Sequence, residues 1–425
     1  MKTLIASLLA SSLFAPSLFT GGAGAASAQD ILIRGATVHT ATAKGTLSNA
    51  DVLIRDGRIQ SIGTGLSADG AVTVEAKGRA LTPGMFAGVS TIGIQEVQAE
   101  PATNDAALVL GAPAFEMQWR PEFDVTTAYN GRSVLVPVTR IEGMTWTVLS
   151  PGVTEGSNFL AGQGAAVTLD GRQDAVLDGS RSLFIDLGGT MNEFSGGSRA
   201  AQWMILEQAV HETRNRVTGD KTLMHPLGRE VFARYLAGGR VVFNVDRAAD
   251  ILRTIAVSKR YGIKPVILGG AEAWIVADEL AEAKVPVVLD ALVNLPDTFD
   301  QIGARLDNAA LLHKAGVKIA FTHFSESHNA RKVRQVAGNA AAHGLPKDVA
   351  LAGLTSNAAD IFGLGASRGR IAAGQVADIV LWSGDPLEVT TVAEQVWIAG
   401  RPIEMRSRQL ELRDRYLERL KQAQR

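Results

Sequence analysis

The chain has 425 residues, of which 46% are hydrophobic and 20% are charged, as in a soluble globular protein with a large core. Lysine and arginine number 42 against 43 for aspartate and glutamate, so the formal net charge of −1 gives no reason to expect nucleic acid or an anionic membrane as a partner. The absence of cysteine excludes disulfides, thiol nucleophiles and thiolate metal sites.

Residues 1–28 have the pattern of a secretory signal peptide. Lys2 provides a positive start, an apolar stretch follows, and Ala26-Ser27-Ala28 is a small-x-small cleavage site. A membrane anchor is the alternative, but Pro16 interrupts the apolar stretch, which falls short of the ~20 residues needed to span a bilayer. We therefore expect a secreted or periplasmic protein with no membrane span once the signal is removed.

Both ends of the mature chain predict short β-strands. In residues 29–82, apolar and polar residues alternate between turns, and Asp56-Gly57 is a hairpin signal because glycine accepts the positive φ that such turns require. A similar pattern returns in residues 367–403. We interpret the two segments as one composite β-sandwich domain.

The middle of the chain, residues 83–366, alternates apolar runs with helical patterns. One such pattern is Arg247–Tyr261, which carries Ile251, Leu252 and Ile255 at helical spacing. Repeated β-then-α units over this length are typical of a parallel sheet, and eight of them predict an α/β fold of the (β/α)8 TIM-barrel type. The runs expected to form its strands are Met85–Ile92, Thr145–Leu149, Ala165–Leu169, Leu183–Leu187, Arg240–Val245, Pro265–Leu268, Val285–Leu289 and Lys318–Phe321.

The last segment, residues 404–425, is charged and has helical periodicity. It carries Leu410, Tyr416, Leu417 and Leu420 on roughly one side. We expect this C-terminal helix to pack on its own domain, and the alternative is a helix that forms an interface.

Several segments together resemble a known family. The chain is similar to a secreted member of the amidohydrolase superfamily, close to the imidazolonepropionase-like group. The resemblance implies a metal-dependent barrel with a small β-sandwich, and hydrolysis of amide or related C–N bonds by water activated on a divalent metal. The segments that carry it are Leu81–Gly84, Ile141–Val148, Val245–Ile251, Leu354–Ala359, Gly369–Ile371, Gly374–Val380 and Gly384–Glu388.

The metal ligands of this family lie at the carboxyl ends of barrel strands, and the matching positions lack them. The His-x-His pair of the first strand falls on Val89 and Thr91, and valine has no lone pair to offer a metal. The fifth-strand histidine falls on Asn244, whose amide oxygen is a weak substitute for imidazole. The sixth-strand histidine falls near Gly269, which has no side chain.

The remaining ligands of the family are also missing. The eighth-strand aspartate falls around His323 or Phe324, and the fourth strand, Leu183–Gly188, contains no lysine that could be carboxylated. A shift of one or two residues could recover a single ligand, such as Asp186, but not five. We therefore expect a degenerate metal site and no cofactor, although the family would use zinc or another divalent metal.

A different site could have been built at the same barrel mouth. Asp290 follows the seventh predicted strand, and His323, Glu326 and His328 follow the eighth. These four are the candidate catalytic residues, because an imidazole that titrates near neutral pH suits proton transfer. The alternative is that they only make a loop polar or bind one another. The candidate substrate-pocket residues are Asn244 and Thr91.

The sequence leaves three functional interpretations open. The first is a pseudoenzyme: an exported amidohydrolase-like protein that binds a small molecule or serves as the subunit of a related amidohydrolase. The second is an active hydrolase of C–N bonds in amides or peptide-like molecules, working through the rebuilt site. The third is a structural cell-envelope protein, which rests only on export and on the terminal helix. The missing ligands favour the first.

Overall fold

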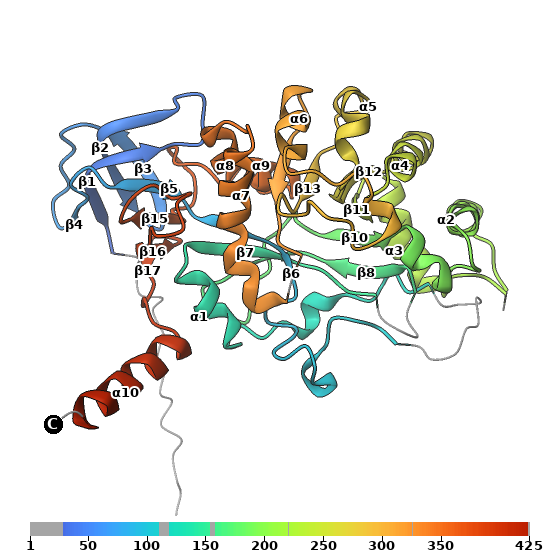
Figure 1. Ribbon diagram of the computed structural model, residues 1–425, viewed down its shortest axis with the longest axis horizontal. Coiled ribbons are helices and arrows are strands. Elements are labelled where there is room, and N and C mark those ends of the chain that lie inside the picture. Colours follow the sequence, from blue (N-terminus) through green and yellow to red (C-terminus); the bar gives the residue numbers. More distant parts are fainter. Residues whose placement is uncertain (1–28, 110–118, 154–157, 220, 325, 424–425) are drawn as a thin grey trace, which may run out of the picture.

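The computed structural model describes residues 29–109, 119–153, 158–219, 221–324 and 326–423. The predicted signal peptide, residues 1–28, lies outside them. The described chain has a mixed α/β fold with three β-sheets and flanking helices (Figure 1). The described strands do not close into a barrel, because no backbone pairing joins the six-stranded and three-stranded sheets of the central region.

The first sheet is assembled from both ends of the chain. Its order is β17-β16-β15-β5-β1-β2-β3, with β4 paired to β1, and β5 and β15 join the two ends as antiparallel neighbours. The predicted Asp56-Gly57 hairpin between β2 and β3 is confirmed, and both residues have positive φ. The bounds are β1 Ile31–His39, β2 Thr46–Arg55, β3 Arg58–Gly63, β4 Val72–Glu75, β5 Ala80–Pro83, β15 Ile379–Trp382, β16 Ala393–Ile398 and β17 Arg401–Pro402.

The six-stranded sheet has the order β14-β13-β12-β11-β10-β8. Its strands β10 to β14 are parallel, so their carboxyl ends lie along one edge, and β8 runs antiparallel to β10. The bounds are β8 Leu160–Gly164, β10 Ser182–Asp186, β11 Arg240–Val245, β12 Lys264–Gly269, β13 Val287–Leu289 and β14 Ile319–Phe321.

The three-stranded sheet differs from the predicted barrel in the direction of one strand. Strands β6 (Met85–Ser90) and β7 (Met144–Leu149) are parallel, but β9 (Ala166–Thr168), expected as the third barrel strand, pairs antiparallel with β7. A parallel neighbour needs a crossover of about a dozen residues or more, usually a helix. In the described chain, β8 is the only element between β7 and β9. No crossover helix therefore separates β7 from β9.

The two central sheets nevertheless enclose a common core. Phe86 and Trp146 from the three-stranded sheet stack with ring centroids 4.5 Å apart, in one buried cluster with Phe184 and Val242 of the six-stranded sheet. At the carboxyl end of β14, the Thr322 hydroxyl accepts a hydrogen bond from the backbone N–H of Val89 at 3.1 Å. The ends of β6 and β14 are therefore held side by side.

Helices cover the outer side of the six-stranded sheet (Figure 1). The predicted helix at Arg247–Tyr261 is α4, which ends before Gly262 in the left-handed conformation that favours glycine. The bounds are α1 Leu135–Arg140, α2 Arg199–Arg214, α3 Pro226–Leu236, α4 Ala248–Tyr261, α5 Ala277–Glu282, α6 Asn308–Lys314, α7 Val333–Ala342, α8 Lys347–Leu354 and α9 Ser356–Ile361.

The C-terminal helix α10 (Arg408–Ala423) does not pack on its own domain as predicted. It begins beside α1 and then projects from the body (Figure 1), and none of its residues is buried. Charged residues on most of its circumference, with Arg413 among the apolar positions, make this helix a poor match for the protein's own core. Within the described residues, no helix is long and apolar enough to cross a membrane.

Candidate functional site

The carboxyl ends of the parallel strands carry the residues that the sequence singled out. Val89 lies near the end of β6, Asn244 near the end of β11, and Gly269 ends β12. His323 follows β14 by two residues. Among the described residues, no group of three or more histidines, aspartates and glutamates is arranged to hold a metal ion. The side chains at these strand ends therefore do not fit the zinc or other divalent metal that the family implies, since a zinc site needs at least three such ligands.

The backbone at Gly269 opposes a ligand at the end of β12. Its φ is +94°, a conformation that L residues rarely adopt, and a Cβ atom there would lie 2.7 Å from Oδ1 of Asp246. The side chain of Asp246 is held in this place by hydrogen bonds from the backbone N–H of Ala271 at 3.0 Å and from Nε2 of Gln301 at 2.8 Å. A histidine at position 269 would thus require both the backbone and Asp246 to move.

Asp290 and His323 form a pair where β13 and β14 end. Oδ2 of Asp290 lies 2.8 Å from Nδ1 of His323 and also accepts a hydrogen bond from the backbone N–H of Phe324 at 3.0 Å. Oδ1 accepts from the backbone N–H of Leu292. The Asp290 side chain is only 4% exposed, and that of His323 is 15% exposed. Nδ1 is engaged, and Nε2 has no partner among the described residues, so Nε2 is the ring atom available to a ligand.

Asp186 and Asn244 form a second pair across neighbouring strands. They are register partners on β10 and β11, and Nδ2 of Asn244 donates to Oδ1 of Asp186 at 2.6 Å. Burial raises the pKa of Asp186 to about 6, although the hydrogen bond from Asn244 opposes this shift. Asp186 can therefore accept a hydrogen bond at neutral pH and donate one in mild acid.

Thr91, the second predicted pocket residue, is occupied by protein contacts. Its hydroxyl donates to Oε1 of Gln95 at 2.8 Å, and its backbone N–H donates to Oγ of Ser327 at 3.0 Å. Glu326 and His328 contact each other at 3.0 Å with about half of each side chain exposed, and among the described residues no hydrogen bond or ion pair joins them to Asp290 or His323. The structure thus brings together two of the four candidate catalytic residues.

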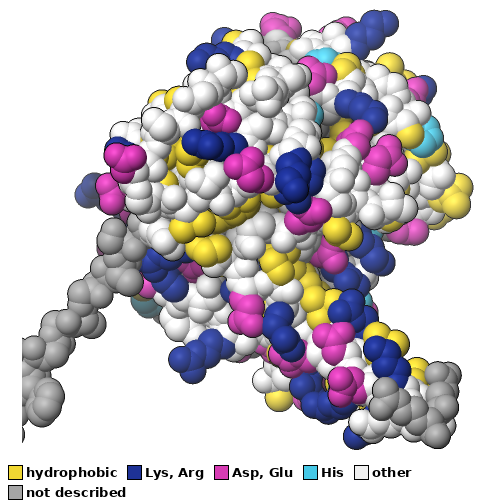
Figure 2. Space-filling model, turned by 90° about the vertical axis from the view of Figure 1, so that its left-hand side faces the viewer, with side chains coloured by type: hydrophobic (Ala, Val, Ile, Leu, Met, Phe, Trp, Pro, Cys, Tyr) yellow, Lys and Arg dark blue, Asp and Glu magenta, His cyan; other side chains and the backbone are white. Residues whose placement is uncertain are grey.

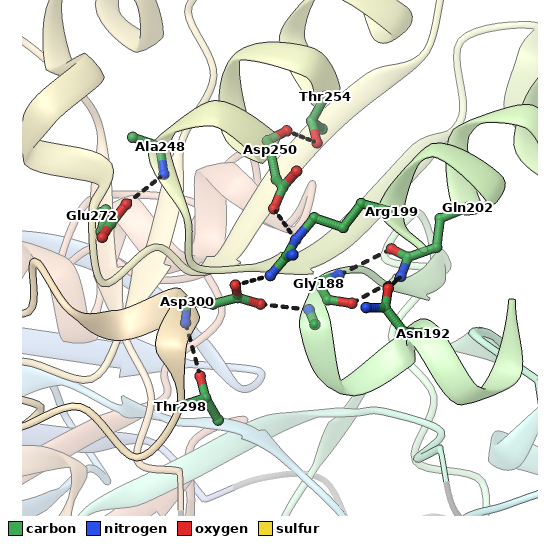
Figure 3. A network of polar contacts seen from close by, with 11 residues as sticks. Gly188, Asn192, Arg199, Gln202, Ala248, Asp250, Thr254, Glu272, Thr298 and Asp300 are labelled. Atoms are coloured by element: carbon green, nitrogen blue, oxygen red, sulfur yellow. Dashed lines mark hydrogen bonds and ion pairs between the residues drawn. The ribbon is translucent and has the colours of Figure 1, made fainter. Parts of the chain in front are cut away.

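A rim network that the sequence did not reveal joins the loops above the strand ends (Figure 3). Arg199, at the start of α2, forms ion pairs with both Asp250 and Asp300. Asp300 also accepts a hydrogen bond from the backbone N–H of Gly189 at 2.6 Å. Burial raises the pKa of Asp250, and the Arg199 charge opposes this shift. The network ties the β10–α2 loop to the start of α4 and to the loop after β13.

Asp246 is another residue that sequence reasoning missed. Burial raises the pKa of its carboxyl, and the hydrogen bonds from Gln301 and Ala271 oppose this shift. The only sequence signal was an aspartate directly after an apolar strand run. Arg199 and Asp300 had no such signal, because they lie 101 residues apart in sequence and only the folded loops bring them together.

The strand ends can bind and exchange protons without a metal. The Asp290–His323 pair holds an imidazole in a fixed orientation, and Asp186 can carry a proton near pH 6. Asn244 adds an amide group that can donate and accept hydrogen bonds. Such groups suit the recognition of amide-like molecules, and they also contain the elements of an acid/base pair.

Comparisons with known proteins find similarity to amidohydrolases. An amidohydrolase family model matches residues 316–403. The protein named "Amidohydrolase tasK" of Hapsidospora irregularis is 39% identical over 90 residues, which are 21% of this chain and 9% of that protein, so the chain spans less than a tenth of its curated relative.

Solved structures extend the likeness to most of the chain. An amidohydrolase from Thermotoga maritima MSB8 is 25% identical, with a TM-score of 0.79 over 88% of this chain and 100% of its own. A prolidase complexed with N-methylphosphonate-L-proline shares the fold at 16% identity, with a TM-score of 0.52 over 88% of this chain and 100% of its own. The family model, the curated relative and the Thermotoga structure together support a relationship of this chain to the amidohydrolase superfamily.

Proposed function

We propose that this protein is a non-catalytic member of the amidohydrolase superfamily, which uses its strand ends to bind a small amide-like molecule. The observation that carries the proposal is the chemistry of the strand ends. Val89, Asn244 and Gly269 stand where the resemblance places histidine ligands, and the described residues contain no alternative cluster of ligands.

The missing histidine ligand at position 269 concerns the backbone as well as the side chain. Gly269 has a left-handed φ, and Asp246 occupies the space that a side chain at 269 would need. A single substitution therefore would not restore a ligand there. This supports a long-standing loss of metal chemistry in preference to the exchange of one ligand for another.

The same groups support binding. Asp186 and Asn244 present a carboxyl and an amide at adjacent strand ends, and this combination can bind both the N–H and the carbonyl of an amide. The prolidase with the similar fold holds a proline derivative. We therefore expect a small cyclic amide or a peptide-like molecule as the ligand.

The proposal extends to the arrangement of the sheets and to the place of the protein in the cell. We infer that the two central sheets are an opened (β/α)8 barrel and that the sheet from both chain ends is its β-sandwich. The signal-like residues 1–28 support export to the periplasm or beyond. An exported protein of this kind could also serve as the subunit of a related, active amidohydrolase, and a related gene with intact histidines next to this one would support that role.

A second candidate function rests on one specific observation. The 2.8 Å contact between Asp290 and His323 fixes an imidazole at the strand ends, where it could act as a general base on water in a metal-free hydrolysis of a C–N bond. Asp186 could then protonate the leaving nitrogen, because burial raises its pKa to about 6.

One experiment separates these functions. The purified mature chain and its His323→Ala and Asp186→Asn variants are incubated with hydantoin and with the dipeptide Gly-Pro, with and without added zinc. Binding is followed by the shift in melting temperature, and hydrolysis by NMR. The proposal predicts a shift for at least one ligand, reduced in Asp186→Asn, without hydrolysis. Hydrolysis abolished by His323→Ala would establish the second candidate, and zinc-dependent hydrolysis would refute both.

A further inference from the structure

A hollow of about 720 Å³ lies at the amino ends of the parallel strands β11 to β14, at the opposite edge of the six-stranded sheet from the candidate site. Pockets that bind small molecules have volumes of ~300–1,000 Å³. Four basic residues line the hollow. Arg240 begins β11, Lys264 begins β12, Lys284 precedes β13 by three residues, and Lys318 directly precedes β14. Each of four neighbouring strands therefore brings one positive charge to the same edge.

The strand register places two of these charges side by side. Arg240 and Lys264 are register partners on β11 and β12, and neighbouring strands lie only about 4.8 Å apart. They precede Val242 and Val266 by two residues, and these valines share one buried cluster, so alternation along the strands turns both basic side chains to the same side of the sheet. Like charges this close repel each other. An anion bound between them would offset that cost.

The acidic side chain of the lining is already neutralised. Asp360 is the only carboxylate among the described residues that line the hollow. Its Oδ2 accepts hydrogen bonds from Nζ of Lys318 at 2.8 Å and from Nη2 of Arg370 at 2.9 Å. Within the described chain, no ion pair joins the other three basic residues of the lining to a carboxylate. Three positive charges of the hollow are therefore left for an external anion.

Arg240 is the most enclosed of these three cations. It is partly buried, and burial lowers the pKa of its guanidinium, because the charged group loses hydration there. Nη1 donates to the carbonyl of Ser180 at 3.2 Å, whereas Nε and Nη2 have no hydrogen-bond partner among the described residues. A Cβ atom at Gly363 would lie 2.6 Å from Nη2, so the glycine leaves room for the guanidinium. A partly buried cation with unused donors is a natural anion ligand.

The rest of the lining favours an anion with an apolar body. Apart from the charged residues, the lining is apolar and includes Pro265 and Pro286. Arginine can bind a phosphate through two parallel hydrogen bonds, and lysine binds it as a point charge. We propose that this hollow binds a small organic phosphate, with the phosphate group on Arg240, Lys264 and Lys284 and the apolar body against the prolines.

Another explanation for the basic residues is their position after helices. Cations stabilise the carboxyl ends of helices, but this effect falls off within the last turn. Arg240 follows the end of α3 by four residues, and Lys264 follows the end of α4 by three. The excess of one sign is also unlike the face in Figure 2, where basic and acidic side chains lie close together. Direct binding measurements separate the two explanations, because helix ends need no ligand.

The test measures binding of phenyl phosphate to the mature full-length chain by titration calorimetry, with inorganic phosphate and benzyl alcohol as comparison probes. We expect phenyl phosphate to bind more tightly than inorganic phosphate, and benzyl alcohol not to bind. Lys264→Ala/Lys284→Ala should raise the Kd for phenyl phosphate about tenfold or more, because two charge-assisted contacts are lost. Both lysines are exposed, so the melting temperature of the free protein should not fall.

The matched control is Lys44→Ala/Lys421→Ala, which removes the same charge at two exposed lysines outside the hollow and should leave the Kd unchanged. Asp186→Asn, at the opposite edge of the sheet, should also leave it unchanged, which separates this site from the proposed amide-binding site. No binding of phenyl phosphate, or equal weakening by the two double variants, would overturn the proposal. Inorganic phosphate that binds as tightly as phenyl phosphate would contradict the apolar contact.

Discussion

Asp246 fills the space beside Gly269: Oδ1 of its carboxyl lies 2.7 Å from the place where a Cβ atom on residue 269 would be. This relationship links the loss of a family ligand to the backbone itself. At the end of β12, the Asp246 carboxyl is held beside Gly269 by hydrogen bonds from Ala271 and Gln301, so this place has little room for a side chain at position 269.

The first prediction concerns Gly269. Gly269→Ala should cost about 3 kcal/mol of unfolding free energy, because it adds the contact with Asp246 to the strain of a left-handed φ. Gly374→Ala is the matched control, since Gly374 has a φ of +84° with no atom within 4 Å of the added Cβ. It should cost only about 1–2 kcal/mol. Urea denaturation measures both, and equal losses would show that Asp246 does not fill the space.

The second prediction concerns Asp290. Asp290→Ala should reduce the unfolding free energy by about 2–3 kcal/mol, because the backbone N–H groups of Leu292 and Phe324 and the ring of His323 lose their acceptor. Asp290→Asn keeps one acceptor oxygen and should cost about half as much. If both variants unfold at the wild-type urea concentration, this carboxyl is not what orders the loop after β14.

The third prediction concerns the titration of Asp186. Its folded pKa of about 6 lies above its ordinary value of 3.8, so the folded state binds the proton more tightly than the unfolded state. Its contribution to stability is therefore fully present below pH 4 and is lost as the pH rises through 6. Relative to wild type, Asp186→Asn should gain about 1–3 kcal/mol between pH 4 and pH 7. Denaturation curves of both proteins across this range give the difference in unfolding free energy at each pH. A difference that does not change with pH would contradict the raised pKa.

The fourth prediction concerns the rim network. Arg199→Ala leaves the buried Asp250 and Asp300 without their counter-charge and should cost about 2–3 kcal/mol at pH 7. The loss should be smaller at pH 4, because burial raises the pKa of Asp250 and protonation of that carboxyl removes its buried charge. Adding Asp300→Asn to Arg199→Ala should recover part of the stability. Faster hydrogen exchange at Gly189 in Arg199→Ala would locate the effect in the β10–α2 loop.

The sequence predicted the parts of the fold that depend on local patterns. Apolar runs identified most of the strands but not β8, and the Asp56-Gly57 turn and the α4 helix follow from residue types at fixed spacing. The direction of β9 was not predictable from its composition, because an apolar run has no polarity. The direction of β9 follows from the absence of a crossover helix between β7 and β9.

The candidate site was predictable to a similar extent. The residues at strand ends were found because an ordered series of strands fixes which residues follow each one, as with Asp290 and His323. The pairing of Arg199 with Asp250 and Asp300 depends on how long loops fold over the strand ends, and nothing local in the sequence records it. The exposure of α10 could not be inferred either, because an amphipathic pattern predicts burial without naming the partner.

Metal content tests the central claim most directly. The mature protein, purified without chelators after growth with added zinc, manganese and iron, is analysed by plasma mass spectrometry and then unfolded thermally with and without a chelator. We predict far less than one ion per chain and the same melting temperature in both conditions. About one divalent ion per chain, whose removal lowers the melting temperature, would show that these strand ends still hold the metal of the family.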